Sequence, residues 1–152
     1  MKHASKFLSF FLFPILVYMV HLIARDVLHL YARYPNLDMP FHYIGGLSIA
    51  YTVSRILSYL ESEKITTAIN RIIFLVLLLS LTATTAVFWE FAEFISDQVL
   101  GTNLQPSIAN TMQDQFLGIL GGGTWALIYA LRELNPKREQ LRNASRSMYK
   151  KH

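Results

Sequence analysis

Acidic side chains recur at helical spacing in two parts of the sequence. Glu90, Glu93 and Asp97 stand at positions i, i+3 and i+7, so they share one face of a helix. Asp38 and His42 are four residues apart and share a face in the same way. Carboxylates and an imidazole are the groups that divalent-metal binding and general acid–base chemistry need, so these residues are the first candidates for a functional site.

A third acidic segment is marked by the absence of basic residues. The sixty residues 72–131 contain no lysine or arginine, yet they include Asp114, which follows Asn110 at i, i+4, and the acids of residues 90–97. A charge inside a bilayer is costly, so an acid within an apolar helix usually faces other helices and marks a functional site. Asp114 therefore belongs with the first two groups.

The composition indicates an integral membrane protein. Hydrophobic residues make up 53% of the 152 residues and charged residues only 16%, against about 25% charged residues in an average soluble domain. The mean hydropathy is +0.31, and there is no cysteine for a disulfide, a thiolate metal site or a nucleophile. The net charge of +4 favours a membrane surface over nucleic acid as the partner of the basic residues, because the chain is so apolar.

Four apolar stretches can supply membrane helices of roughly 20 residues each. The first follows two lysines, as a signal peptide would, but no small-x-small cleavage site follows it, which favours a retained helix. We therefore expect an all-α, integral membrane four-helix bundle over residues 1–131, followed by a basic cytoplasmic tail, 132–152. The four spans cover about 7–24, 41–60, 72–95 and 112–131.

The distribution of lysine and arginine predicts the orientation of the spans. With four spans, twelve of the fourteen basic residues fall on one side, and only Arg25 and Arg33 fall on the other. Both termini are therefore expected in the cytoplasm of a multi-pass protein of the bacterial inner (plasma) membrane. The basic tail is expected to contact anionic lipid, and no nucleic-acid partner is expected.

This topology brings the acidic segments to one level near the outer surface. Carboxylates so close together must take up protons, pair with cations such as Arg25, Arg33 or His42, or bind metal. A set of oxygens with one imidazole suits Zn, Mn, Mg or Fe, so a divalent metal is the expected cofactor. His21, near the outer end of the first span, is a further member. The predicted metal ligands are Asp38, His42, Glu90, Glu93, Asp97 and Asp114.

Small residues predict where two spans approach each other closely. Gly118 and Gly122 form a G-x-x-x-G pattern, and residues 82–86 are all threonine or alanine, so the third and fourth spans are expected to pack there. Gly45 and Gly46 are expected to allow a similarly close helix contact in the second span. The aromatic residues at the outer end of the third span, Phe88, Trp89 and Phe91, fit an interfacial belt.

The acidic motifs resemble those of a known group of proteins. The sequence is similar to the small bacterial inner-membrane proteins of the YjdF type and, more distantly, to the VanZ-like family. This resemblance implies the architecture and the site rather than a reaction, although VanZ-like proteins are associated with glycopeptide resistance and the cell envelope. Asn110 replaces the first acid of the last motif, which implies one weaker ligand. The matching motifs are Asp38-Met-Pro-Phe-His42 with Gly45 and Gly46, Trp89-Glu90-Phe91-Ala92-Glu93, and Asn110-Thr111-Met112-Gln113-Asp114 with the glycines at 118 and 121–123.

Three functions remain open at this stage, and enzymatic activity is not decided among them. The first is a metal-assisted hydrolase or transferase acting on a lipid or envelope-linked substrate, with Glu90, Glu93 and His42 as the catalytic residues. The second is an ion- or proton-conducting or transport protein, with a pore formed by homo-oligomerisation. The third is a structural or regulatory membrane scaffold in which the polar cluster locks the helices together.

Overall fold

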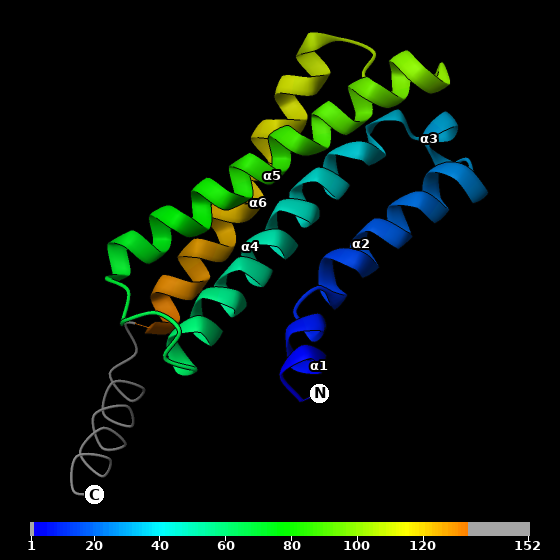
Figure 1. Ribbon diagram of the computed structural model, residues 1–152. Coiled ribbons are helices and arrows are strands. Elements are labelled where there is room, and N and C mark those ends of the chain that lie inside the picture. The colour runs from blue at the N-terminus through cyan, green and yellow to red at the C-terminus, as the bar shows by residue number, and fades with distance from the viewer. Residues whose placement is uncertain (1, 134–152) are drawn as a thin grey trace, which may run out of the picture.

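The computed structural model describes residues 2–133, and all of the regular structure in that part of the chain is helical (Figure 1). The fold class predicted from the sequence, all-α, is therefore confirmed for these residues, whereas most of the predicted basic tail, 134–152, lies outside them. The elements in order are α1 (Lys2–Ser9), α2 (Leu12–Leu22), the π-helix η1 (Ile23–Val27), α3 (Leu30–Arg33), the 3-10 helix η2 (Pro35–Leu37), α4 (Asp38–Ser62), α5 (Arg71–Leu100) and α6 (Ile108–Glu133).

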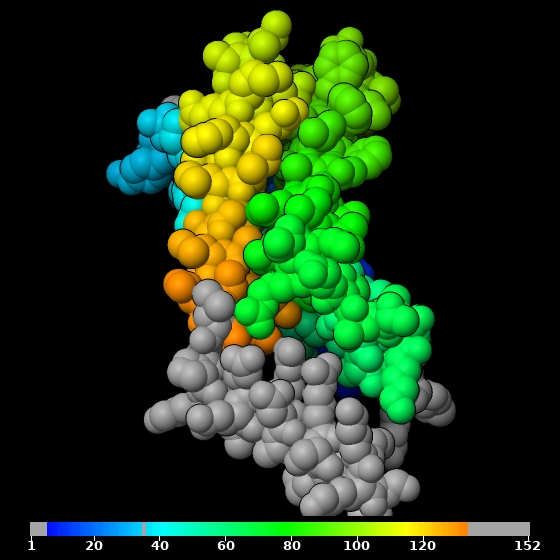
Figure 2. Space-filling view, turned by 90° about the vertical axis from the view of Figure 1, so that its left-hand side faces the viewer, coloured from blue at the N-terminus to red at the C-terminus, as the bar shows by residue number. Residues whose placement is uncertain are grey.

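Helix α4 is at the centre of the arrangement. It contacts α2, α5 and α6, and α5 also packs against α6. Figure 1 shows these long helices side by side, and Figure 2 shows α5 and α6 together along one face of the molecule. The predicted spans 41–60, 72–95 and 112–131 each lie within a single helix, α4, α5 and α6 respectively.

The first predicted span is not one continuous helix, because α1 ends at Ser9 and α2 begins at Leu12. Pro14 explains the break, since proline has no N–H to give to the carbonyl four residues earlier and its ring clashes with it. That carbonyl belongs to Phe10, and it accepts a hydrogen bond of 2.9 Å from the Thr52 hydroxyl of α4 instead. The interruption in α1–α2 is thus satisfied by a side chain from the neighbouring helix.

Glycines let α6 approach both α4 and α5 closely. A Cβ on Gly46 would overlap the backbone of Gly118, and a Cβ on Gly121 would overlap the Tyr43 carbonyl. A Cβ on Gly122 would lie 2.7 Å from the Thr82 side chain, which agrees with the predicted packing of the third and fourth spans. The tightest contact, between α4 and α6, involves Gly46, which was expected to allow a close approach in the second span, although its partner helix was not predicted. Gly45, the other expected contact in α4, has nothing within 4 Å of its Cβ position.

Apolar side chains cover much of the exterior. Within residues 2–133, α5 is the one helix long and apolar enough to cross a membrane by length and composition, with a mean hydropathy of 2.3 in its most apolar window. Only 17% of that window is buried, so most of these side chains face outward. Helices α4 and α6 are less apolar because glycine and hydroxyl residues occupy their contact faces, and the unbroken part of the first span, α2, has only 11 residues.

The interior divides into an apolar part and a polar part. Ala50, Leu57, Phe74, Leu78 and Ala126 form the apolar core, which lies in the first half of α5 and the second halves of α4 and α6. The opposite ends of the same three helices carry buried acidic and imidazole side chains. Because α5 runs antiparallel to its neighbours, the end of α5 meets the beginnings of α4 and α6 there.

Candidate functional site

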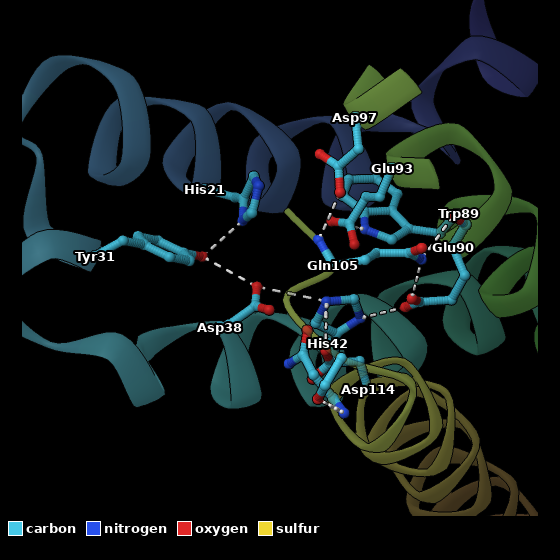
Figure 3. A network of polar contacts seen from close by, with 12 residues as sticks. His21, Tyr31, Asp38, His42, Trp89, Glu90, Glu93, Asp97, Gln105 and Asp114 are labelled. Carbon is cyan, nitrogen blue, oxygen red and sulfur yellow. Dashed lines mark hydrogen bonds and ion pairs between the residues drawn. The ribbon is translucent and has the colours of Figure 1, made fainter. Parts of the chain in front are cut away.

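The imidazole of His42 lies among carboxylates from three helices (Figure 3). Its Nε2 atom is 3.4 Å from Asp38 Oδ1, one turn earlier in α4, and 4.0 Å from Asp114 Oδ2 of α6. Its Nδ1 atom is 3.7 Å from Glu90 Oε1 of α5. The two ring nitrogens therefore face different carboxylates, which gives the site two sides.

Two sets of three residues are spaced closely enough to hold a metal ion. One set is Asp38, His42 and Asp114, and the other is His42, Glu90 and Glu93. In each set one potential ligand atom from every residue lies within 4.8 Å of the others. Five of the six predicted metal ligands thus come together, and both sets depend on the same imidazole.

Several buried atoms of the cluster have no hydrogen-bond partner among the described residues. They include both carboxylate oxygens of Asp114, Glu90 Oε1 and His42 Nε2. Asp114 is only 1% exposed and Glu90 only 2%. A buried carboxylate oxygen without a partner is energetically costly, so these atoms mark a place where a bound group would stabilise the protein.

The arginines expected to neutralise the cluster are engaged elsewhere. Arg25 Nε pairs with Asp26 Oδ1 at 2.7 Å, and the Arg33 guanidinium lies over the Tyr34 ring. Within residues 2–133, His42 is the only basic side chain that pairs with the clustered acids. Four carboxylates therefore share at most one imidazolium charge.

Side chains of α5 and the following loop hold two of the acids in place. The Gln105 amide donates hydrogen bonds to Glu90 Oε2 at 2.8 Å and to the Glu90 carbonyl at 2.9 Å. The Trp89 indole N–H donates to Glu93 Oε1 at 2.9 Å. Trp89 therefore points toward the cluster, because its polar N–H finds an acceptor there. Phe88, one residue earlier, is exposed, as expected for the belt.

Asp97 lies outside both candidate metal sets. Its carboxylate accepts hydrogen bonds from the Thr102 hydroxyl at 2.6 Å and from the backbone N–H groups of Leu104 and Gln105 at 2.8 and 2.9 Å. Asp97 thus holds the loop after α5 in the conformation that presents Gln105 to Glu90. Its contribution to the site is indirect.

Tyr31 links Asp38 to the first long helix. Its hydroxyl donates to Asp38 Oδ1 at 3.4 Å and lies 2.9 Å from His21 Nδ1. Burial, together with the negative charge of Asp38, raises the pKa of the Tyr31 hydroxyl, which therefore stays protonated. His21 joins the cluster through this hydroxyl, and its Nε2 has no partner among the described residues.

Sequence reasoning missed Tyr31 and Gln105 as members of the site. Both lie outside the long helices, on α3 and in the loop before α6, so no helical spacing connects them to the acids. Asn110, which shares a face of α6 with Asp114, also keeps its Oδ1 buried without a described partner.

An apolar cavity of about 100 Å³ lies beside the cluster, between α2, α4 and α5. His21 and His42 line it together with Trp89 and with apolar residues such as Val17 and Ile49. The two imidazoles thus stand where an apolar space meets the acidic site.

Comparison with known proteins agrees with this picture of an apolar helical protein. Residues 3–135 match a family described as "Predicted membrane protein (DUF2238)". The chain belongs to this family. Searches of curated proteins and of solved structures gave no match. Membership of DUF2238 supports a membrane protein, as expected from the sequence, and does not single out the YjdF-type or VanZ-like proteins.

Proposed function

We propose that this DUF2238 protein is a multi-pass protein of the bacterial inner membrane that binds a divalent cation at the His42 cluster. In this proposal α2, α4, α5 and α6 form a four-helix transmembrane bundle, with both termini in the cytoplasm and the cluster near the outer surface. Family membership, the apolar exterior and the one-sided distribution of basic residues support this arrangement.

The observation that carries the metal proposal is the buried Asp114 carboxylate, whose two oxygens have no described partner and which faces His42 Nε2. With all four carboxylates ionised, an imidazolium would leave three negative charges uncompensated. A divalent cation bound by a neutral His42 offsets two of the four negative charges and satisfies the unpartnered oxygens at the same time. Ligands at about 2.1 Å from a metal lie roughly 3.0–3.4 Å from one another, so separations of 3.4–4.0 Å need only a small contraction.

The two sides of the imidazole suggest different roles for the acids. Metal-bound histidine usually gives its other ring N–H to a carboxylate, which fixes the tautomer. We assign Asp38, Asp114 and His42 Nε2 as ligands, and Glu90 as the acceptor for Nδ1–H. Gln105 in turn holds Glu90.

The same arrangement is suited to metal-assisted chemistry on an amphiphilic substrate. Asp38, Asp114 and His42 would hold the ion with positions left for water, and the ion would supply a water of lowered pKa. Glu93, held by the Trp89 indole and grouped with His42 and Glu90, is our candidate for the general base. The adjoining apolar cavity favours a lipid or lipid-linked substrate, whose chain would lie between α2 and α5. Hydrolysis or group transfer at the outer surface is the reaction class that follows.

Elemental analysis of detergent-purified protein tests the metal proposal. We expect about one equivalent of Zn, Mn, Mg or Fe in the wild-type protein. The metal content of Asp114→Asn should be at least tenfold lower. Asp26→Asn is the matched control, because Asp26 is exposed and paired with Arg25, and it should retain the metal. Less than ~0.1 equivalent in the wild-type protein, with no rise in melting temperature on adding any of the four ions, would reject the proposal and favour a polar lock.

A further inference from the structure

A second cavity lies at the end of the molecule opposite the His42 cluster. It has a volume of about 350 Å³ and lies between α1, α4 and α6. Arg55, one of the residues that line it, is thirteen residues after His42 in α4, or about 20 Å along the helix. Lysine, arginine and glutamate side chains line this cavity, whereas none of these residue types lines the apolar cavity near His42.

Three basic side chains from three different segments line this cavity, and each is held over an aromatic ring. A guanidinium stacked on a ring uses its flat face, so the N–H donors at its edge remain available for a ligand. The three pairs are Lys6 Nζ over Tyr59 at 5.1 Å, Arg55 Cζ over Phe10 at 5.2 Å, and Arg132 Cζ over Trp125 at 5.5 Å from the ring centroid.

The edge donors of the two arginines are not used by any other described residue. Arg55 and Arg132 form no ion pair or side-chain hydrogen bond within residues 2–133, and Lys6 is 3.9 Å from Glu63 in an exposed pair. Among the described residues, Glu133 is the one acid that lines the cavity. With Glu63 paired to Lys6, three positive charges face two negative charges, which leaves the cavity with a positive balance.

The aromatic supports are themselves fixed in position. The Trp125 indole N–H donates a hydrogen bond of 3.0 Å to Ser54 Oγ, so the ring beneath Arg132 is tied to α4. Phe10, beneath Arg55, is buried, and its carbonyl is bound by Thr52. The two guanidinium groups are therefore partly oriented before any ligand binds, which reduces the entropy lost on binding.

We propose that this cavity binds a phosphate group. Guanidinium edges match the geometry of phosphate oxygens in two-point hydrogen bonds, and the Lys6 ammonium adds a third positively charged donor at the cavity. The cavity lies at the end where the basic residues of the chain accumulate, so both the headgroup of an anionic phospholipid and free phosphate can reach it. The site uses Arg132, the first residue of the predicted basic tail, together with Arg55 and Lys6 from other helices, and it does not depend on metal binding at His42.

Trp125 provides a direct reporter, because the chain has two tryptophans and Trp89→Phe leaves only Trp125. The full-length Trp89→Phe protein in neutral detergent is titrated separately with phosphatidylglycerol in mixed micelles, with phosphatidylcholine in the same micelles, and with inorganic phosphate. Trp125 fluorescence and the melting temperature are followed in each titration. We expect phosphatidylglycerol to change both signals, and a phosphate response of comparable size would identify free phosphate as a source for the same site.

Charge-removing variants decide whether the basic side chains are responsible. Arg55→Gln and Arg132→Gln should each weaken binding about tenfold, since a charge-assisted hydrogen bond contributes roughly that factor. Arg33→Gln is the matched control, because Arg33 also lies over an aromatic ring but at the other end of the molecule, and this variant should bind phosphate as the parent does. Equal responses to the two lipids with none to phosphate, or unchanged affinity in both variants when size-exclusion chromatography shows that they are folded, would overturn the proposal.

Discussion

The contact between Gly46 of α4 and Gly118 of α6 connects the packing of the helices to the geometry of the site. His42 is four residues before Gly46, and Asp114 is four residues before Gly118, so each lies one turn from the contact on its own helix. Gly46→Ala would place a methyl group against the Gly118 backbone, which has no flexible side chain to move aside. The helices must separate, and the distance of 4.0 Å between His42 Nε2 and Asp114 Oδ2 must increase.

The expected loss of stability in Gly46→Ala is compared with the effect of the same substitution at the neighbouring Gly45. Overpacking of this kind costs about 1–3 kcal/mol, whereas replacing glycine by alanine in a helix stabilises it by about 1 kcal/mol where there is space. Gly45→Ala and Gly123→Ala test the stabilising effect of alanine, because neither glycine has an atom within 4 Å of its Cβ position. Because the gain in helix propensity is common to both variants, Gly46→Ala should be about 1–3 kcal/mol less stable than Gly45→Ala, a difference of about 2–12 °C in melting temperature for a chain of this length.

The assay is thermal unfolding of the purified variants in one detergent, with and without added divalent metal. We expect Gly46→Ala to melt lower than the wild-type protein and to gain less stability from metal than Gly45→Ala gains. If Gly46→Ala and Gly45→Ala have the same melting temperature, the close approach of α4 and α6 is incorrect. If Gly46→Ala melts lower but responds to metal as the wild-type protein does, the link between this contact and the site fails.

Two further predictions concern side chains that satisfy buried groups in neighbouring segments. Gln105→Leu removes the donor that holds Glu90, so metal affinity measured by competition with a chelator should fall about 10-fold or more; unchanged affinity would contradict the assigned role of Glu90. Thr52→Val leaves the Phe10 carbonyl without its donor and should lower stability by about 1–3 kcal/mol. Thr85→Val is the control, because the exposed Thr85 hydroxyl is bonded within its own helix, and it should change the stability by less than about 0.5 kcal/mol. Equal losses of stability in the two threonine variants would refute the explanation of the break at Pro14.

The first predicted span illustrates where reasoning from hydropathy fails. Residues 7–24 are apolar enough to suggest one membrane helix, but Pro14 stops the hydrogen-bonding pattern, and the helix breaks at residues 10–11. The proline was visible in the sequence. What the sequence did not contain was the identity of the donor that makes the break tolerable, because Thr52 is 42 residues away and reaches Phe10 only after α2 has packed against α4.

The sequence by itself determined the helices and the residues that share a face within each of them. Spacings such as Asp38 with His42 and Glu90 with Glu93 depend on the repeat of a single helix, so they required no tertiary information. The antiparallel order of three helices then brought these faces to one end, as the distribution of basic residues also predicted.

The tertiary structure alone decided how these groups meet. It turned His42 Nε2 toward Asp38 and Asp114 and Nδ1 toward Glu90, and it paired Arg25 with Asp26 rather than with the cluster. Neither result follows from the spacing of residues along a helix, because the partner of a side chain depends on where segments distant in the sequence lie in the folded protein. Helical periodicity is local and can be read from the chain, whereas the satisfaction of buried charge depends on the whole packed arrangement.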